Sequence, residues 1–246
     1  MKTKLAIIGA SELQNPLILK AKEMGCETHV FAWKADDVGE KTADFFYPIS
    51  ITEKEEILAK CREIGIDGIT TIGSDLATVA VCYVADALGL PGNSLECNLV
   101  STNKHEMRRC FESCGDPSPK SLMVESVEDL AGKDLVYPVI VKPLDRSGSR
   151  GITKVEDFSG LKAAIEAAKE SGFDKHALVE EFAEGEEFSV EFISFEGQHH
   201  FLSMTKKFTT GAPHFIETGH IEPAFEGTPE ILNCVIQVVD HALTSL

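Results

Sequence analysis

The N-terminal part of the chain alternates short β-branched runs with stretches of helical apolar spacing, and this alternation restricts the fold more than any other feature. The runs at 4–8, 28–32 and 68–72 are typical of buried strands, and helical stretches such as 53–64 and 74–88 follow them. Strands that alternate with helices in this way form a parallel sheet with helices on both faces. We therefore predict an α/β domain at residues 1–94.

The glycine turn after the first run does not match a dinucleotide-binding turn. Residues 9–14 read G-A-S-E-L-Q and lack the second and third glycines that let a backbone approach a pyrophosphate, so nicotinamide binding is not predicted. Residues 33–37 and 71–75 follow the second and third runs, at the strand ends where such sheets bind ligands. They are predicted either to face a substrate or to be solvated loops.

Residues 95–246 have a different pattern. Short apolar runs at 121–124, 152–155 and 177–181 indicate strands, and alternating residues predict a hairpin of 187–195 and 199–208. An amphipathic helix is expected at 158–171 and a last helix from Thr228 onward. This half is therefore predicted to be α+β with an antiparallel sheet.

Residues 137–151 read Y-P-V-I-V-K-P-L-D-R-S-G-S-R-G and combine an apolar strand with a lysine and a glycine loop. Because desolvating an unpaired ammonium costs several kcal/mol, Lys142 needs an anionic partner, and phosphate is the obvious candidate. Gly148 and Gly151 leave the loop free to fold over a ligand. The alternative is a hairpin turn with a solvated lysine. No Walker loop is present, since the lysine precedes the glycines.

The charge balance excludes several classes of partner. Lys and Arg total 23 against 40 Asp and Glu, a formal net charge of −17, which repels nucleic acid and anionic lipid surfaces. No apolar run reaches the roughly 20 residues of a membrane helix. We therefore expect a cytoplasmic protein without nucleic-acid or membrane partners, in which a few local cations hold any anionic ligand.

Four motifs, in order along the chain, carry a resemblance to a known family. They are the N-terminal parallel sheet, the N-K-H-E-M-R helix at 103–108 with G-D-P-S-P at 115–119, V-K-P at 141–143 with its glycine loop, and V-E-E-F-A-E-G-E-E at 179–187. Together they resemble the ATP-grasp superfamily. The resemblance implies a preATP-grasp domain followed by an ATP-grasp domain at 95–246, with a lid subdomain at 119–181 and the start of a second subdomain at 182–246.

The resemblance also implies a role for each matching residue. Lys104 and Lys142 match the two phosphate-binding lysines, and Ser147, Gly148, Ser149 and Gly151 match the mobile loop over the β and γ phosphates. The segment of Glu180, Glu181, Phe182 and Ala183 matches the linker whose backbone contacts adenine, and Glu187 matches the acid that holds the ribose hydroxyls. Taken singly, the lysines are ordinary surface residues and the acids a solvated sheet edge.

Residues 214–224 contain Glu217 and His220 in an E-x-x-H spacing. This element is similar to one in the branch of the family that ligates amino acids, where both residues would lie by the substrate. A structural histidine in a turn is the competing interpretation. The implied reaction transfers the γ-phosphoryl of ATP to a carboxylate, and an amine then displaces phosphate; small-molecule carboxylates and amines are the expected partners, and a homodimer is compatible with the resemblance.

The metal site departs from the family pattern. The magnesium ligands of the family, an acid followed by an E-x-N pair, lie after the helix that here runs into Leu246. We therefore expect ATP and Mg²⁺ as cofactors, with the Mg²⁺ ligands C-terminal to Leu246, and interpret the chain as part of a longer ligase that is inactive by itself and binds ATP weakly. Two alternatives stay open: a bicarbonate-phosphorylating enzyme like carbamoyl phosphate synthase or biotin carboxylase, and a non-catalytic ATP-binding module.

Overall fold

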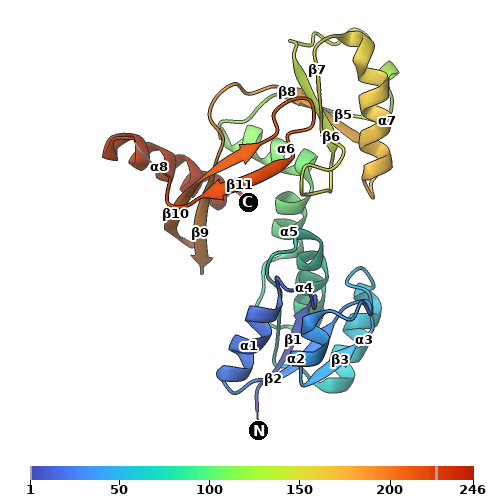
Figure 1. The fold of residues 1–246 in the computed structure, drawn as a ribbon, viewed down its shortest axis with the longest axis vertical. Helices are drawn as coiled ribbons and strands as arrows, with labels where there is room; N and C mark the ends of the chain where they lie inside the picture. Colours follow the sequence, from blue (N-terminus) through green and yellow to red (C-terminus); the bar gives the residue numbers. More distant parts are fainter. Residues whose placement is uncertain (1, 225–226) are drawn as a thin grey trace. The chain divides into compact units, whose positions relative to one another are not determined.

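The computed structural model describes residues 2–224 and 227–246, and the chain divides into two compact units between Thr102 and Asn103 (Figure 1). The sequence places this division between residues 94 and 95. The difference is one helix, α5 (Leu95–Thr102), which contacts α4 (Asp75–Leu88) in the first unit.

The first unit is a parallel four-stranded sheet in the order β3-β2-β1-β4, as the strand and helix alternation predicts. Its strands are β1 (Lys4–Ile8), β2 (Glu27–Phe31), β3 (Phe45–Tyr47) and β4 (Gly68–Thr70), and its other helices are α1 (Asn15–Glu23), α2 (Val38–Thr42) and α3 (Lys54–Ile64). Ile7 and Val30 pack with Ile18 of α1, whereas Ile8 and Phe31 pack with α3 and α4. Successive strand residues thus bury both faces of the sheet.

Two short elements of the first unit are absent from the sequence-based expectation. β3 has three residues, and α2 has five and begins with a capping box between Asp37 and Glu40. Residues 33–37 were predicted to face a substrate or to be a solvated loop; residues 33–36 are exposed and outside any helix or strand, in agreement with a loop, and Asp37 caps α2.

The second unit contains an antiparallel sheet in the order β5-β8-β6-β7, covered on one face by α7 (Leu161–Ser171). Its strands are β5 (Ser121–Val124), β6 (Val139–Pro143), β7 (Thr153–Val155) and β8 (Ala177–Glu181), with short 3-10 helices at Val127–Leu130 and Phe158–Gly160. Val139 and Val141 are buried against α7. Because side chains alternate along a strand, Lys142 lies on the face opposite α7.

A second antiparallel sheet, in the order β11-β10-β9, follows along the chain. It consists of β9 (Phe188–Phe195), β10 (Gln198–Thr209) and β11 (Glu217–Ile221), and the unit also contains α6 (Lys104–Cys114) and α8 (Pro229–Ser245). The β9–β10 hairpin confirms the expected α+β character. β11 was not predicted, since its sequence, E-T-G-H-I, has no apolar alternation.

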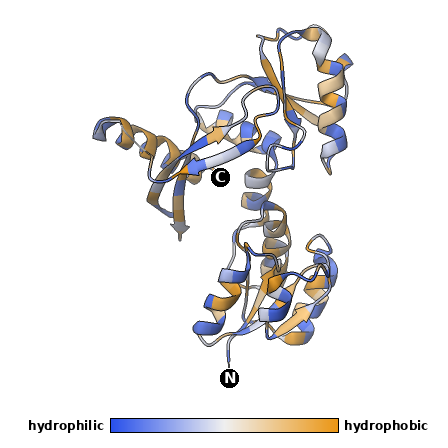
Figure 2. Ribbon diagram, viewed as in Figure 1, coloured by the Kyte–Doolittle hydropathy of each residue, from blue (hydrophilic) through white to orange (hydrophobic). Residues whose placement is uncertain are grey.

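The C-terminal helix α8 is held at its end by Asp116, two residues after the end of α6. His241 Nδ1 lies 2.6 Å from Asp116 Oδ1, and the Ser245 hydroxyl donates to Asp116 Oδ2 at 2.7 Å. α8, whose residues are all described, carries apolar residues along its length (Figure 2), yet none of them is buried. Within residues 2–224 and 227–246, we find no helix with the length and apolar character needed to span a membrane.

Candidate functional site

A cavity of about 600 Å³ in the second unit is lined by several of the site residues predicted from the sequence. β6 and the glycine loop contribute Lys142 and Ser149, and β8 with the segment after it contributes the residues at 180–187. The predicted residues that line it are Lys142, Ser149, Glu180, Glu181, Phe182, Ala183 and Glu187. β10 and the loop that follows it complete the cavity with Lys207 and Phe215.

An ion-pair cluster forms the polar floor of the cavity. Lys142, with 13% of its side chain exposed, binds the Glu180 carboxylate, which is 6% exposed. Arg108 Nε donates to the other oxygen of Glu180 at 3.1 Å. Burial lowers the pKa of Lys142, and the Glu180 charge opposes this shift. The cluster therefore carries two cations against one anion, a net positive charge in an acidic protein.

Arg108 was not among the predicted site residues. It lies one helical turn after Lys104 on α6, so the two side chains share a face of that helix. The spacing of four residues between Lys104 and Arg108 was the sequence signal that could have identified Arg108 as a site residue. The partner, Glu180, is far away in sequence, and only the fold brings the two together.

Lys104 is not among the described residues that line the cavity. Its ammonium donates to the Arg146 carbonyl at 2.7 Å, and its backbone N–H donates to the Leu144 carbonyl at 3.0 Å. Lys104 therefore contacts the segment that leads from β6 into the glycine loop. Of the two lysines, Lys142 is the one that lines the cavity.

The glycine loop has left-handed backbone conformations at three positions. φ is +68° at Gly148, +54° at Ser149 and +67° at Gly151. A Cβ at Gly151 would lie 2.7 Å from Ser171, whereas Gly148 has open space around it. Glycine is thus required at 151 by packing as well as by φ. Of the predicted loop residues Ser147, Gly148, Ser149 and Gly151, only Ser149 is among the described residues lining the cavity.

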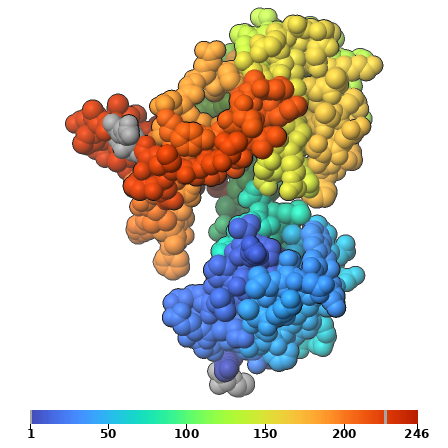
Figure 3. All heavy atoms as spheres, viewed as in Figure 1, coloured from blue at the N-terminus to red at the C-terminus, as the bar shows by residue number. Residues whose placement is uncertain are grey.

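The loop between β10 and β11 lies against this glycine loop (Figure 3). The Ser149 hydroxyl donates to the Phe215 carbonyl at 2.8 Å, and the Lys154 N–H donates to the Pro213 carbonyl at 2.9 Å. Phe215 has φ +52°, an uncommon value for a bulky residue. Its ring lies 6.0 Å from that of Phe182, so two aromatic rings meet at the wall of the cavity.

A second charged cluster joins Glu187 to the residues of the E-x-x-H element. Lys207 Nζ lies 2.8 Å from Glu187 Oε1 and 2.9 Å from Glu217 Oε1. His220 Nε2 lies 4.0 Å from Glu217 Oε2. The fold therefore brings Glu217 and His220 together on β11, and Lys207, which was not predicted as a site residue, links Glu217 to Glu187.

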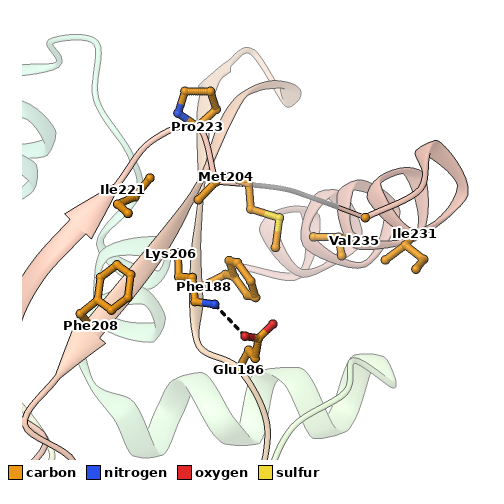
Figure 4. Close-up of a pocket in the computed structure, with 11 residues that line it drawn as sticks. Glu186, Phe188, Met204, Lys206, Phe208, Ile221, Pro223, Ile231 and Val235 are labelled. Carbon is orange, nitrogen blue, oxygen red and sulfur yellow. Dashed lines mark hydrogen bonds and ion pairs between the residues drawn. The ribbon is translucent and has the colours of Figure 1, made fainter.

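The other face of the β9–β11 sheet, toward α8, has a second cavity of about 770 Å³ (Figure 4). Its lining is largely apolar and includes Phe188, Met204, Phe208, Ile221, Ile231 and Val235. Lys206 and Glu186, which pair at 2.7 Å, line both cavities. Lys206 and Lys207, neighbours on β10, therefore pair with different carboxylates.

Among the described residues, no group of three or more His, Cys, Asp or Glu side chains is arranged to hold a metal ion. The sequence contains an E-x-N string at Glu96-Cys97-Asn98, but this string lies within α5 of the first unit. The Asn98 amide donates to the Thr78 hydroxyl at 3.2 Å. Residues two apart on a helix point to different sides, so this string does not form the pair on strands that the family uses.

Comparison with known proteins identifies one domain. Residues 135–243 match the family model described as ATP-grasp domain. The chain is 24% identical over 229 residues to a D-alanine–D-alanine ligase of Hydrogenovibrio crunogenus, which covers 78% of this chain and 71% of that protein. It is 30% identical over 112 residues to the corresponding ligase of an Azoarcus species, covering 44% of this chain and 36% of that one.

The described fold is also that of a solved ligase. The crystal structure of an L-amino acid ligase from Bacillus licheniformis superposes with a TM-score of 0.84 and 25% identity, over 99% of this chain and 60% of the ligase. The chain thus spans between about a third and 71% of the proteins that it resembles.

Proposed function

Since this chain contains an ATP-grasp domain, at residues 135–243, we propose that it binds ATP in the cavity of the second unit as part of a ligase that joins a carboxylate to an amine. The observation that carries the proposal is the convergence of Lys142, the 180–183 segment, Glu187 and Ser149 on one cavity. These residues come from separate segments of the chain, and each offers the chemistry that one part of a nucleotide requires.

Different residues of the cavity bind different parts of the nucleotide. Lys142 and Arg108 together outweigh the charge of Glu180 at the floor of the cavity, and this local positive charge favours the phosphates. The backbone of Glu180 to Ala183 offers N–H and C=O groups for the adenine edge, and Phe182 offers a ring face for it. The Glu187 carboxylate accepts hydrogen bonds from the ribose hydroxyls. The loop of Ser147 to Gly151 closes over the β and γ phosphates and excludes water, and Lys104 supports that loop through the Arg146 carbonyl.

The proposed reaction has two displacements. A substrate carboxylate oxygen attacks the γ-phosphorus and ADP leaves, which gives an acyl phosphate. The amine nitrogen then attacks the acyl carbon, phosphate leaves, and the nitrogen loses a proton. Positioning and charge neutralisation dominate such steps, so no protein nucleophile is assigned.

The substrate class is proposed to be amino acids. Glu217 and His220 lie beside each other on β11, and Glu217 is bound to Lys207 of the cavity lining, so its carboxylate can accept a hydrogen bond from an ammonium group. The similarity to D-alanine–D-alanine and L-amino acid ligases supports this choice. Mg²⁺ would accompany ATP and neutralise its phosphates, and we propose that its ligands lie C-terminal to Leu246. A cytoplasmic location and a homodimer complete the proposal.

An ADP-release screen tests the proposed reaction. The full-length ligase is assayed with ATP and Mg²⁺ against single amino acids, amino-acid pairs and bicarbonate. Amino-acid-dependent ADP release is the expected result, with an amide as second product. ADP release with bicarbonate alone would show that the protein is a bicarbonate-phosphorylating enzyme and would overturn the assignment of amino acids as substrates. Nucleotide binding without release in any mixture would favour a non-catalytic ATP-binding module.

A further inference from the structure

The ammonium group of Lys207 is shared by two carboxylates with different proposed roles. It lies 2.8 Å from Glu187, assigned to the ribose, and 2.9 Å from Glu217, assigned to the substrate. Lys207 is also held through its backbone, whose N–H donates to the Glu187 carbonyl at 3.2 Å. One side chain is thus in direct contact with both halves of the site.

The burial of Lys207 and the exposure of its two carboxylate partners mean that a ligand can change how its charge is shared between them. Lys207 is 19% exposed, whereas Glu187 and Glu217 are 54% and 40% exposed and reachable by ligands. Burial alone would lower the pKa of Lys207, and its bonds to Glu187 and Glu217 outweigh burial, so this pKa lies above the ordinary value. The hydrogen bond from Lys207 holds the pKa of Glu217 below its ordinary value, and nearby His220 acts in the same direction.

We propose that Lys207 is a positioning residue that couples ribose recognition at Glu187 to the carboxylate of Glu217 on the substrate side. This inference rests on the proposed function. When the ribose hydroxyls donate to Glu187, they compete with Lys207 for its oxygens. The ammonium then pairs more fully with Glu217, which keeps that carboxylate ionised and fixed for an amino-acid substrate. Nucleotide binding therefore prepares the substrate site through one lysine.

Two nucleotides that differ only in the ribose test this coupling. ADP and 2′,3′-dideoxy-ADP carry the same phosphates, but the second lacks both hydroxyls that would donate to Glu187. The titration of Glu217 is followed by ¹³C NMR of the side-chain carboxyl in the 246-residue chain, with each nucleotide at saturation. The coupling predicts a Glu217 pKa about half a unit or more lower with ADP than with the dideoxy nucleotide.

Three variants separate coupling from a structural role of Lys207. Lys207→Met should abolish the difference between the two nucleotides, and Lys207→Arg, which keeps the charge and both ion pairs, should restore it. Lys206→Met is the matched control, because Lys206 is the neighbouring residue on β10 and binds Glu186 instead. It should retain the difference. Thermal unfolding of each variant verifies that the second unit stays folded.

The outcomes distinguish this inference from the function on which it rests. Equal Glu217 pKa values with both nucleotides in the wild type would overturn the coupling and leave nucleotide binding intact. A difference that survives in Lys207→Met would also overturn it, because the route would then avoid Lys207. If neither nucleotide binds at any concentration, the proposed function fails, and the coupling fails with it.

Discussion

Lys142 and Glu180 lie on the same face of neighbouring strands, β6 and β8, and form an ion pair at the floor of the cavity. The strand register explains the pair. Glu180 stands opposite Ile140, and Lys142 lies two residues further along the same face. Arg108 adds a second cation from α6. The pair thus holds a lysine in a fixed position from which it can contact an anion.

Loss of the Lys142 ammonium should weaken nucleotide binding. Lys142→Met removes a charged hydrogen bond to the phosphates, a loss of about 1.5–3 kcal/mol or roughly 10- to 150-fold in affinity for ADP. Calorimetric titration measures this change. Lys162→Met, at an exposed position on α7, is the control and should bind like the wild type. Equal affinities in Lys142→Met and the wild type would disprove the phosphate assignment.

Lys142 and Glu180 should also be coupled energetically. Glu180→Gln leaves Lys142 and Arg108 without their carboxylate and should lower the free energy of unfolding by about 1–3 kcal/mol. In the double variant with Lys142→Met, the two losses should not add, because both remove the same ion pair. Urea unfolding gives the four free energies of this cycle. Additive losses would show that the two side chains act independently.

The two loop glycines should respond differently to alanine. Gly151→Ala combines a left-handed φ with a Cβ 2.7 Å from Ser171, and we expect a loss of about 2 kcal/mol or more in stability. Gly148→Ala has a similar φ but open space, so about 1 kcal/mol is expected. Chemical denaturation compares the two variants. A larger loss at 148 than at 151 would contradict the packing described for the loop.

The attachment of α8 to α6 should depend on pH. Hydrogen bonds from His241 and Ser245 hold the pKa of Asp116 below its ordinary value. The stabilisation is therefore complete above the unfolded-state pKa, about 3.9, and is lost as the pH falls through the lower folded-state value. Asp116→Asn should lower the melting temperature at pH 7 and lose its effect as the pH falls below the folded-state pKa of Asp116. Asp240→Asn, exposed on the same helix, is the control; an effect of Asp116→Asn that is constant with pH would refute the attachment through the ionised Asp116 carboxylate.

Local patterns in the sequence were sufficient to predict much of the fold. α4 begins at the Ser74 cap and ends at Gly89, and β5 and β8 have the predicted bounds. These elements have strong signals of capping or apolar composition. β11 has none, because Gly219 and polar residues interrupt it, and it becomes a strand only by pairing with β10. Tertiary pairing supplied what local propensity did not.

The candidate site shows the same division. Lys142 and the segment from Glu180 to Ala183 belong to contiguous motifs, so the sequence predicts them. Arg108 and Lys207 are defined by their partners, and those partners are brought to them by α6 and by the pairing of β9, β10 and β11. The sequence around a strand lysine such as Lys207 does not indicate which carboxylates lie near it on the neighbouring strands. Such residues emerge only when the register is known.

The structure of the 246-residue chain with ADP bound is the most direct test of the central claim. The account predicts phosphate oxygens within hydrogen-bonding distance of Lys142, adenine against the backbone of Phe182 and Ala183, and ribose hydroxyls on Glu187. ADP bound elsewhere, or in this cavity with its phosphates remote from Lys142, would contradict it.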